Sequence, residues 1–156
     1  MHTENVIFIR GSVDRIFELA ANIQNWPQLL PHYRFVEVVE QSVDGCRRVV
    51  VMSANRDDFP VPGARFPVTW RSVQVCDPDE HRIYFKHVRG MATGMWVVWE
   101  IDEDEWGRGV KVVIKHDLRY PFSILNGWFA GDVVGQGFVS AIAGRTLARL
   151  KEIVEA

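Results

Sequence analysis

The feature that most constrains this chain is the order of its two hydrophobic periodicities. Between residues 34 and 120, apolar and polar residues alternate over one segment after another, as in strands that bury one face. Toward the C-terminus the spacing becomes that of a helix, with one stripe of Val139, Ile142, Thr146, Leu150 and Ile153. An antiparallel sheet needs an apolar cover for one face, and only this final helix is long enough to supply it.

The alternating region predicts a meander of six strands. The connections are mostly short and polar, such as Asp44-Gly45 in the first hairpin and residues 77–80 in a later one. Short connections of this kind join antiparallel neighbours. The strands are expected at 34–41, 46–54, 67–76, 81–88, 93–101 and 109–120.

One strand and two short helices are predicted before the meander. Residues 4–10 are rich in β-branched and aromatic residues and indicate a strand. Ser12 suits the N-cap of a helix with one apolar face, and Pro27 suits the first turn of a second helix that Pro31 ends. The sequence therefore predicts a single α+β domain over residues 1–156, with the order strand, two short helices, six strands, long helix.

Composition and charge exclude several classes of function. Hydrophobic residues make up 47% of the chain and charged residues 24%, as in an ordinary globular domain. Eighteen Lys and Arg stand against twenty Asp and Glu without a basic cluster, so no nucleic-acid partner is expected. No apolar run is long enough to span a membrane, and the N-terminus lacks the pattern of a secretory signal. We therefore expect a cytoplasmic protein, either a monomer or a homodimer.

The sequence contains none of the common catalytic or metal-binding signatures. There is no phosphate-binding glycine loop, no nucleophile elbow and no His/Cys set at the spacing of metal ligands, so we expect no cofactor and no metal. Cys46 and Cys76 lie thirty residues apart in strand-like segments. They are interpreted as two reduced thiols, with a disulfide as the alternative.

Two segments carry the resemblance of this chain to a known family. They are NWPQLLPHY at 25–33 and RTLARLKEIVEA at 145–156. With the order of elements, they resemble the polyketide cyclase/dehydrase and coenzyme Q-binding branch of the START-like superfamily, also called Bet v 1-like or SRPBCC. The resemblance spans nearly the whole chain. It implies a helix-grip fold, in which a curved seven-stranded antiparallel sheet wraps around the long C-terminal helix and encloses an apolar cavity for lipids, quinones, plant hormones or polyketide chains.

The resemblance to the aromatase/cyclase members of this family also implies a set of cavity residues, namely Trp26, Tyr33, Trp70, Ser72 and Trp99. Those enzymes are thought to use an arginine to polarise polyketide carbonyls, and this chain has Gln74 at the matching position. Arg71 is near in sequence but falls on the opposite strand face. The difference counts against the cyclase mechanism and not against ligand binding.

Three polar residues are further candidates for the site. His116 alternates with apolar residues of its strand and is expected to point inward, either to anchor a carbonyl or protonate an enolate, or as a core histidine with a nearby partner. Tyr33 either donates a hydrogen bond to a ligand or has a structural role at its corner. Ser140, in the final helix, is also assigned to the ligand.

Large aromatic residues are frequent in the segments expected to border the core. They either fill the space between sheet and helix or line a pocket. The tryptophans concerned are Trp26, Trp70, Trp96, Trp99 and Trp128.

The irregular stretch 55–67 contains three prolines and has two interpretations. It is a lid over the cavity, built on Phe59, Val61 and Phe66, or a stiff connector between strands.

A glycine stripe precedes the final helix at Gly127, Gly131 and Gly135. Three glycines in helical register need a reason, because each is unfavourable inside a helix. They let the helix approach the sheet closely, or they keep the cavity open, or residues 121–131 form a loop and the helix begins near Asp132.

Three functions remain on sequence grounds. The first is binding, for sequestration or transport, of a hydrophobic small molecule such as a lipid, quinone or polyketide. The second is a polyketide aromatase/cyclase, in which His116 or Tyr33 handles protons during aldol closure and dehydration. The third is an interaction domain without a ligand, which predicts a collapsed core.

Overall fold

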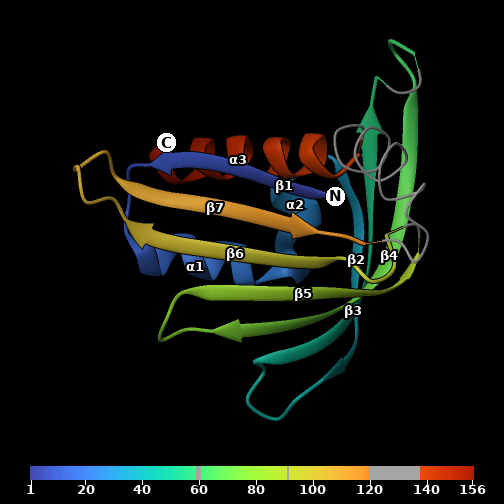
Figure 1. Cartoon of the computed structure of the whole chain (residues 1–156), viewed down its shortest axis with the longest axis horizontal. Coiled ribbons are helices and arrows are strands. Elements are labelled where there is room, and N and C mark those ends of the chain that lie inside the picture. Colours follow the sequence, from blue (N-terminus) through green and yellow to red (C-terminus); the bar gives the residue numbers. More distant parts are fainter. Residues whose placement is uncertain (59–60, 91, 120–137) are drawn as a thin grey trace.

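The computed structural model describes residues 1–58, 61–90, 92–119 and 138–156. A seven-stranded antiparallel sheet with the order β1-β7-β6-β5-β4-β3-β2 curves around the C-terminal helix (Figure 1). The predicted α+β helix-grip fold is confirmed. The strands are β1 (His2–Ile9), β2 (Tyr33–Gln41), β3 (Arg47–Asp57), β4 (Arg65–Asp77), β5 (Arg82–Gly90), β6 (Trp96–Glu103) and β7 (Val110–Asp117). The helices are α1 (Val13–Ala21), the 3-10 turn η1 (Ile23–Asn25), α2 (Trp26–Leu29) and α3 (Ser140–Glu155).

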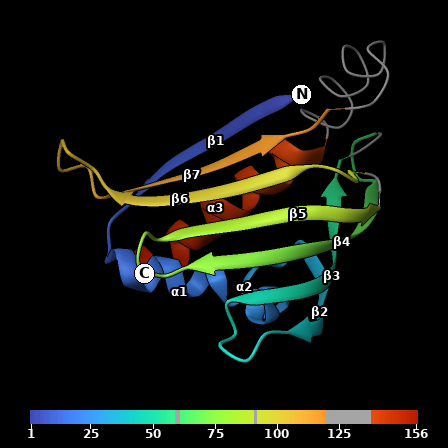
Figure 2. The same ribbon diagram turned by 60° about the horizontal axis from the view of Figure 1, so that its bottom comes forward.

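The sheet is the predicted meander with one addition at its edge. Strands β2 to β6 each pair with the next strand in sequence, and β1 pairs with β7. The concave face holds α3, and α1 and α2 lie at one end of the sheet (Figure 2). Figure 1 shows the hairpin of β3 and β4 extending past the N-terminal end of α3. Among the described residues, no helix has the length and hydropathy needed to cross a bilayer.

Helix α1 begins as the sequence predicts and is fastened at its end by the sheet. The Ser12 hydroxyl accepts a hydrogen bond from the Arg15 backbone N–H at 3.1 Å. At the other end, the Ala21 carbonyl accepts bonds from Gln74 Nε2 at 3.1 Å and from Arg48 at 3.2 Å. These two side chains satisfy a carbonyl that the end of the helix leaves without an intrahelical partner.

Helix α3 is anchored along β1 by three polar contacts. Asn5 Nδ2 donates to the Ser140 carbonyl at 3.1 Å, and Lys151 Nζ donates to the Phe8 carbonyl at 2.8 Å. The backbone N–H of Arg10 donates to Glu155 at 2.9 Å. The most buried stripe of α3 is rotated slightly from the predicted one, because Ile142 and Ile153 are only partly buried. It consists of Ala143, Thr146, Leu147, Leu150 and Val154.

The prediction of a long irregular stretch at 55–67 is wrong. Strand β3 continues to Asp57 and β4 already begins at Arg65, with Pro67 opposite Asn55. Pairing of β4 with β5 starts only at Trp70, so the missing N–H of Pro67 removes no ladder bond on that side. Val61 and Phe66 are exposed, and the Phe66 ring lies 5.6 Å from that of Phe138.

Other predictions have mixed outcomes. Trp96 does not border the core, because its side chain is on the outer face, where Lys86 Nζ lies 4.4 Å from the ring centroid.

The two cysteines are free thiols, as predicted. Phe59, Trp128 and the glycine stripe at 127, 131 and 135 lie outside the described residues.

The pairing of β4 with β5 is interrupted by a β-bulge between Arg71 and Ser72, and Gly90 lies beside it, opposite Trp70. Gly90 has a φ of 110°, and a Cβ there would lie 2.7 Å from the Thr69 carbonyl oxygen and 3.0 Å from Trp70 Cα. We expect Gly90→Ala to lower the free energy of unfolding by about 2–4 kcal/mol, because it combines backbone strain with a clash against rigid backbone. Urea unfolding measures the change.

Gly94→Ala is the matched control for this substitution. Gly94 has a similar φ of 92° but no atom within 4 Å of the added Cβ. It should cost about 1 kcal/mol, from the backbone alone. Equal losses for the two variants would show that the close approach at Gly90 is unimportant.

Candidate ligand-binding cavity

A cavity of about 90 Å³ lies between the concave face of the sheet and the first turns of α3. Its walls come from α2, from strands β2 to β7, from the β5–β6 connection and from α3. The lining residues are Trp26, Tyr33, Met52, Val68, Trp70, Phe85, His87, Ala92, Met95, Val97, Trp99, Ile114, His116, Phe138, Val139, Ile142, Ala143 and Thr146. Most of these side chains are apolar or aromatic, and none is charged.

Trp26 is the centre of the aromatic wall. Its ring centroid lies 5.0 Å from that of Tyr33, 5.8 Å from Trp99 and 6.5 Å from Phe85. The indole Nε1 donates to the Leu19 carbonyl at 3.1 Å, so its polar edge is satisfied within the protein. Rings at these separations and angles pack favourably and form a rigid surface. Trp26 therefore presents a fixed flat wall to the cavity.

Two imidazoles, from His87 on β5 and His116 on β7, are the most distinctive polar groups of the cavity. Each residue is 7% exposed, and each Nδ1 is buried without a hydrogen-bond partner. The His87 ring stacks on Trp70, with 5.6 Å between centroids and an interplanar angle of 10°. Burial lowers the pKa of His87 to about 3 and that of His116 to about 4, so both rings are neutral at pH 7.

A second polar group of the cavity is a small network around Thr146 of α3. The Thr146 hydroxyl donates to the Ile142 carbonyl at 2.9 Å, so the 2.9 Å contact with His32 Nε2 requires the imidazole to donate. Burial raises the pKa of the Tyr33 phenol, and the Thr146 side chain opposes this rise. Burial and the nearby Arg145 lower the pKa of His32 to about 4. The network is therefore uncharged at pH 7.

The structure brings together five of the eight residues that the sequence assigned to the ligand. Trp26, Tyr33, Trp70, Trp99 and His116 line the cavity. The inward orientation predicted for His116 is confirmed.

The other three residues, Ser72, Gln74 and Ser140, are not among the lining side chains. Ser72 is fully buried opposite His87 in the sheet, and its hydroxyl has no partner. Gln74 is fully buried and holds the end of α1. The Ser140 hydroxyl accepts from Asn5 Nδ2 at 3.2 Å and faces β1.

His87 is the functional candidate that sequence reasoning undervalued. It alternates with Ile83 and Phe85 on β5, in the same way that His116 alternates with apolar residues on β7. The signal was therefore present in the strand pattern. Within the described part of the chain, no group of three or more His, Cys, Asp or Glu residues is arranged to hold a metal ion.

Comparisons with known proteins identify the family. The model of the family described as "Polyketide cyclase / dehydrase and lipid transport" matches residues 9–142. The chain belongs to this family. It is 35% identical over 46 residues to a Streptomyces halstedii protein provisionally named a polyketide cyclase, a match that spans 30% of this chain and 42% of that relative.

Solved structures of low sequence identity share the fold. A protein of Thermus thermophilus has a TM-score of 0.76 at 19% identity, with 99% of this chain and 97% of that chain covered. The aromatase/cyclase Zhui of Streptomyces sp. R1128 has a TM-score of 0.73 at 18% identity, with 99% and 93% covered. The di-domain ARO/CYC StfQ of the steffimycin pathway has a TM-score of 0.74 at 22% identity, and the match covers 99% of this chain and 50% of StfQ. The family is compatible with hydrophobic ligand binding and with polyketide cyclisation.

The buried imidazoles predict a loss of stability in acid. The unfolded chain protonates each imidazole near pH 6.5, whereas folded His116 does so only near pH 4. Between pH 6.5 and pH 4 the unfolded state therefore binds more protons than the folded state. The contribution of neutral His116 to the free energy of unfolding is complete above pH 6.5 and decreases as the pH falls through this range. At pH 4.5 we expect His116 alone to account for about 2 kcal/mol of the loss.

Urea unfolding at pH 7.5 and pH 4.5 measures this contribution by comparison with His116→Gln. The variant should lose less stability between the two pH values, by about 2 kcal/mol, because glutamine does not titrate. Carboxylates such as Asp104, whose pKa Arg108 lowers, contribute equally to both proteins. The same pH dependence in both proteins would contradict a neutral, buried His116.

Proposed function

We propose that this protein binds a hydrophobic small molecule in the cavity between the sheet and α3. The observation that carries the proposal is the aromatic lining with two inward imidazoles whose Nδ1 atoms lack partners. Unpartnered polar atoms are unfavourable in a core, and a ligand with oxygen functions in the cavity would offer the lining imidazoles hydrogen bonds.

The cavity must widen to take a ligand of more than one ring. Its volume of about 90 Å³ is below the roughly 300–1,000 Å³ of typical small-molecule sites. Met52 and Met95 both line it, and unbranched methionine side chains repack at low cost. We therefore expect ligand binding to displace these two side chains while the tryptophan wall stays in place.

Filling the cavity from α3 tests the proposal. Ala143 is buried and lines the cavity, so Ala143→Leu places a larger side chain in its space. We expect this variant to weaken the binding of 2-naphthol by at least about tenfold, because the ring and the new side chain compete for one volume. Quenching of intrinsic tryptophan fluorescence measures binding, since three tryptophans line the cavity.

Ala148→Leu is the matched control on the same helix. Ala148 is exposed, so the added side chain projects away from the core. Its affinity for 2-naphthol should equal that of the unmodified protein. Equal affinity for Ala143→Leu would contradict binding in this cavity, and native mass spectrometry of gently purified protein gives an independent test for a co-purifying ligand.

Polyketide cyclisation is the second candidate function. The family and the aromatase/cyclase neighbours support it, and His116 and Tyr33 would handle the protons. Against it, neither His87 nor His116 hydrogen-bonds to a carboxylate in the described part of the chain, so neither forms an assembled acid/base pair. Burial raises the pKa of the Tyr33 phenol, which disfavours the phenolate that would act as a base.

A poly-β-ketone thioester distinguishes the two functions. If the cavity catalyses aldol closure, His116→Ala and Tyr33→Phe should slow formation of the aromatic product by about a hundredfold, as expected for loss of a general acid or base. Affinity for 2-naphthol should change less than the rate. Absorbance of the product measures turnover, and identical rates with the protein, with either variant and in buffer alone would contradict catalysis and leave binding as the function.

A further inference from the structure

No Lys or Arg side chain lines this cavity in the described part of the chain. All eighteen Lys and Arg residues and all five His residues lie in the described part of the chain, because residues 59–60, 91 and 120–137 contain none of them. None of the eighteen Lys and Arg is among the lining residues. The segments outside the description therefore add no cation to the site.

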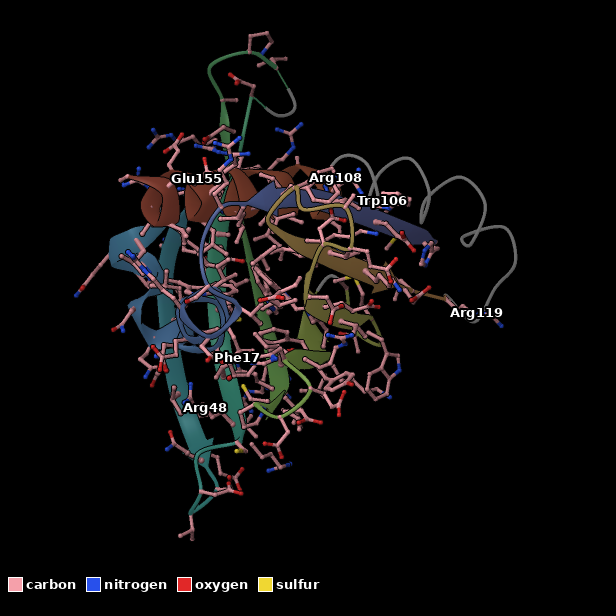
Figure 3. The ribbon with its side chains drawn as sticks, turned by 90° about the vertical axis from the view of Figure 1, so that its left-hand side faces the viewer. Phe17, Arg48, Trp106, Arg108, Arg119 and Glu155 are labelled. Atoms are coloured by element: carbon pink, nitrogen blue, oxygen red, sulfur yellow. The ribbon has the colours of Figure 1, made fainter. Side chains whose placement is uncertain are left out.

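Five Lys and Arg residues adjoin lining residues in sequence, and none of them lines the cavity. Arg34 donates to the Ser53 hydroxyl, Lys86 lies over the Trp96 ring, and Lys115 pairs with Glu100. Arg71 alternates on β4 with the partly buried Trp70 and the buried Ser72, so it takes the outer face, where it is opposite Arg89 of β5. Arg145 precedes Thr146 but forms an ion pair with Asp57. Arg108 and Arg119 lie at the periphery of the fold (Figure 3).

The polar groups that do line the cavity are uncharged at pH 7. They are the imidazoles of His87 and His116, the phenol of Tyr33 and the hydroxyl of Thr146, which come from β5, β7, β2 and α3. His32 lies behind Thr146 and is also neutral. The imidazoles can exchange hydrogen bonds with a hydroxyl or carbonyl oxygen, whereas Thr146 already donates its proton to the Ile142 carbonyl. None of these neutral groups can neutralise a carboxylate.

We propose that the cavity selects uncharged aromatic ligands bearing hydroxyl or carbonyl oxygens and excludes carboxylates with the same ring skeleton. This inference rests on the proposed binding function. A charge transferred into an apolar site without a partner is strongly unfavourable, whereas a neutral oxygen can bond to the imidazoles. Flat walls such as the stacked Trp70 and His87 rings favour planar molecules. Fatty acids in their ionised form are excluded by the same argument.

Three probes with one ring skeleton test this selectivity on the full chain. At pH 7.5, 2-naphthol and methyl 2-naphthoate are neutral, and 2-naphthoate is an anion. We expect the two neutral probes to bind within about tenfold of each other and the anion to bind at least about a hundredfold more weakly. Quenching of tryptophan fluorescence and calorimetry measure the affinities.

The pH dependence gives a second measurement that needs no variant. Lowering the pH from 7.5 to 5.5 should raise the apparent affinity for 2-naphthoate roughly tenfold per unit, as the neutral acid forms. Affinity for the other two probes should stay constant. The groups that face the cavity do not titrate in this range, because the pKa values of His87, His116 and His32 are about 3, 4 and 4 and the pKa of Tyr33 is raised.

Met95→Lys supplies the missing charge. Lysine has an unbranched side chain like that of methionine and would place an ammonium in the lining. It should bind 2-naphthoate at least about tenfold more tightly than the unmodified protein, and Met95→Leu should not. If Met95→Lys does not fold, the probe series and its pH dependence on the unmodified chain still decide the question.

The outcomes separate this inference from the function on which it rests. Equal affinities for methyl 2-naphthoate and 2-naphthoate at pH 7.5 would overturn the charge selection and leave ligand binding intact. Binding of none of the three probes would contradict the proposed function itself.

Discussion

The packing of α3 against the concave face of the sheet determines both the stability of this fold and its cavity. The C-terminal half of the helix buries Leu147, Leu150 and Val154 in the core, and Lys151 ties it to the Phe8 carbonyl of β1. The N-terminal half presents the small Ala143 instead. Because one rigid helix spans both regions, its large side chains close the core at one end while its small ones leave space at the other. Core and cavity are parts of one interface.

Buried polar groups show where this interface is not optimised for stability. The Nδ1 atoms of His87 and His116 and the hydroxyl of Ser72 lack partners among the described residues, and each such group costs about 1–3 kcal/mol. By contrast, the polar groups at the ends of the helices are satisfied, as with the Ala21 and Leu19 carbonyls. Other buried side-chain atoms without partners, such as Thr3 Oγ1 on β1 and Arg48 Nε on β3, belong to residues that do not line the cavity. The two imidazoles are therefore distinguished by lining the cavity and not by lacking partners alone.

The sequence predicted the fold better than the site. Strand alternation shows which face of the sheet a side chain is on, but it does not show whether that side chain lines the cavity or is covered by another element. The parity of β7 placed His116 correctly, and the same parity in β5 would have placed His87. Parity also placed Gln74 on the inner face, but only the tertiary structure shows that α1 covers it. The β3–β4 connection was predicted too long because Pro67 normally argues against a strand, and the pairing partners of β4 are not visible in the sequence.

Gln74 links the chemistry of the cavity to the architecture around it. Resemblance to aromatase/cyclases implies an arginine at this position, where a guanidinium would bring a positive charge to the inner face of β4. Here the amide donates to the Ala21 carbonyl and fastens α1 to the sheet. An amide meets this structural requirement without charge, so the position contributes to packing and contributes no electrophile. Gln74 does not line the cavity, so this contact adds no charge beside it, and the neutrality of the cavity comes from the lining residues themselves. The ligand proposed for this cavity would be recognised by shape, aromatic stacking and neutral hydrogen bonds.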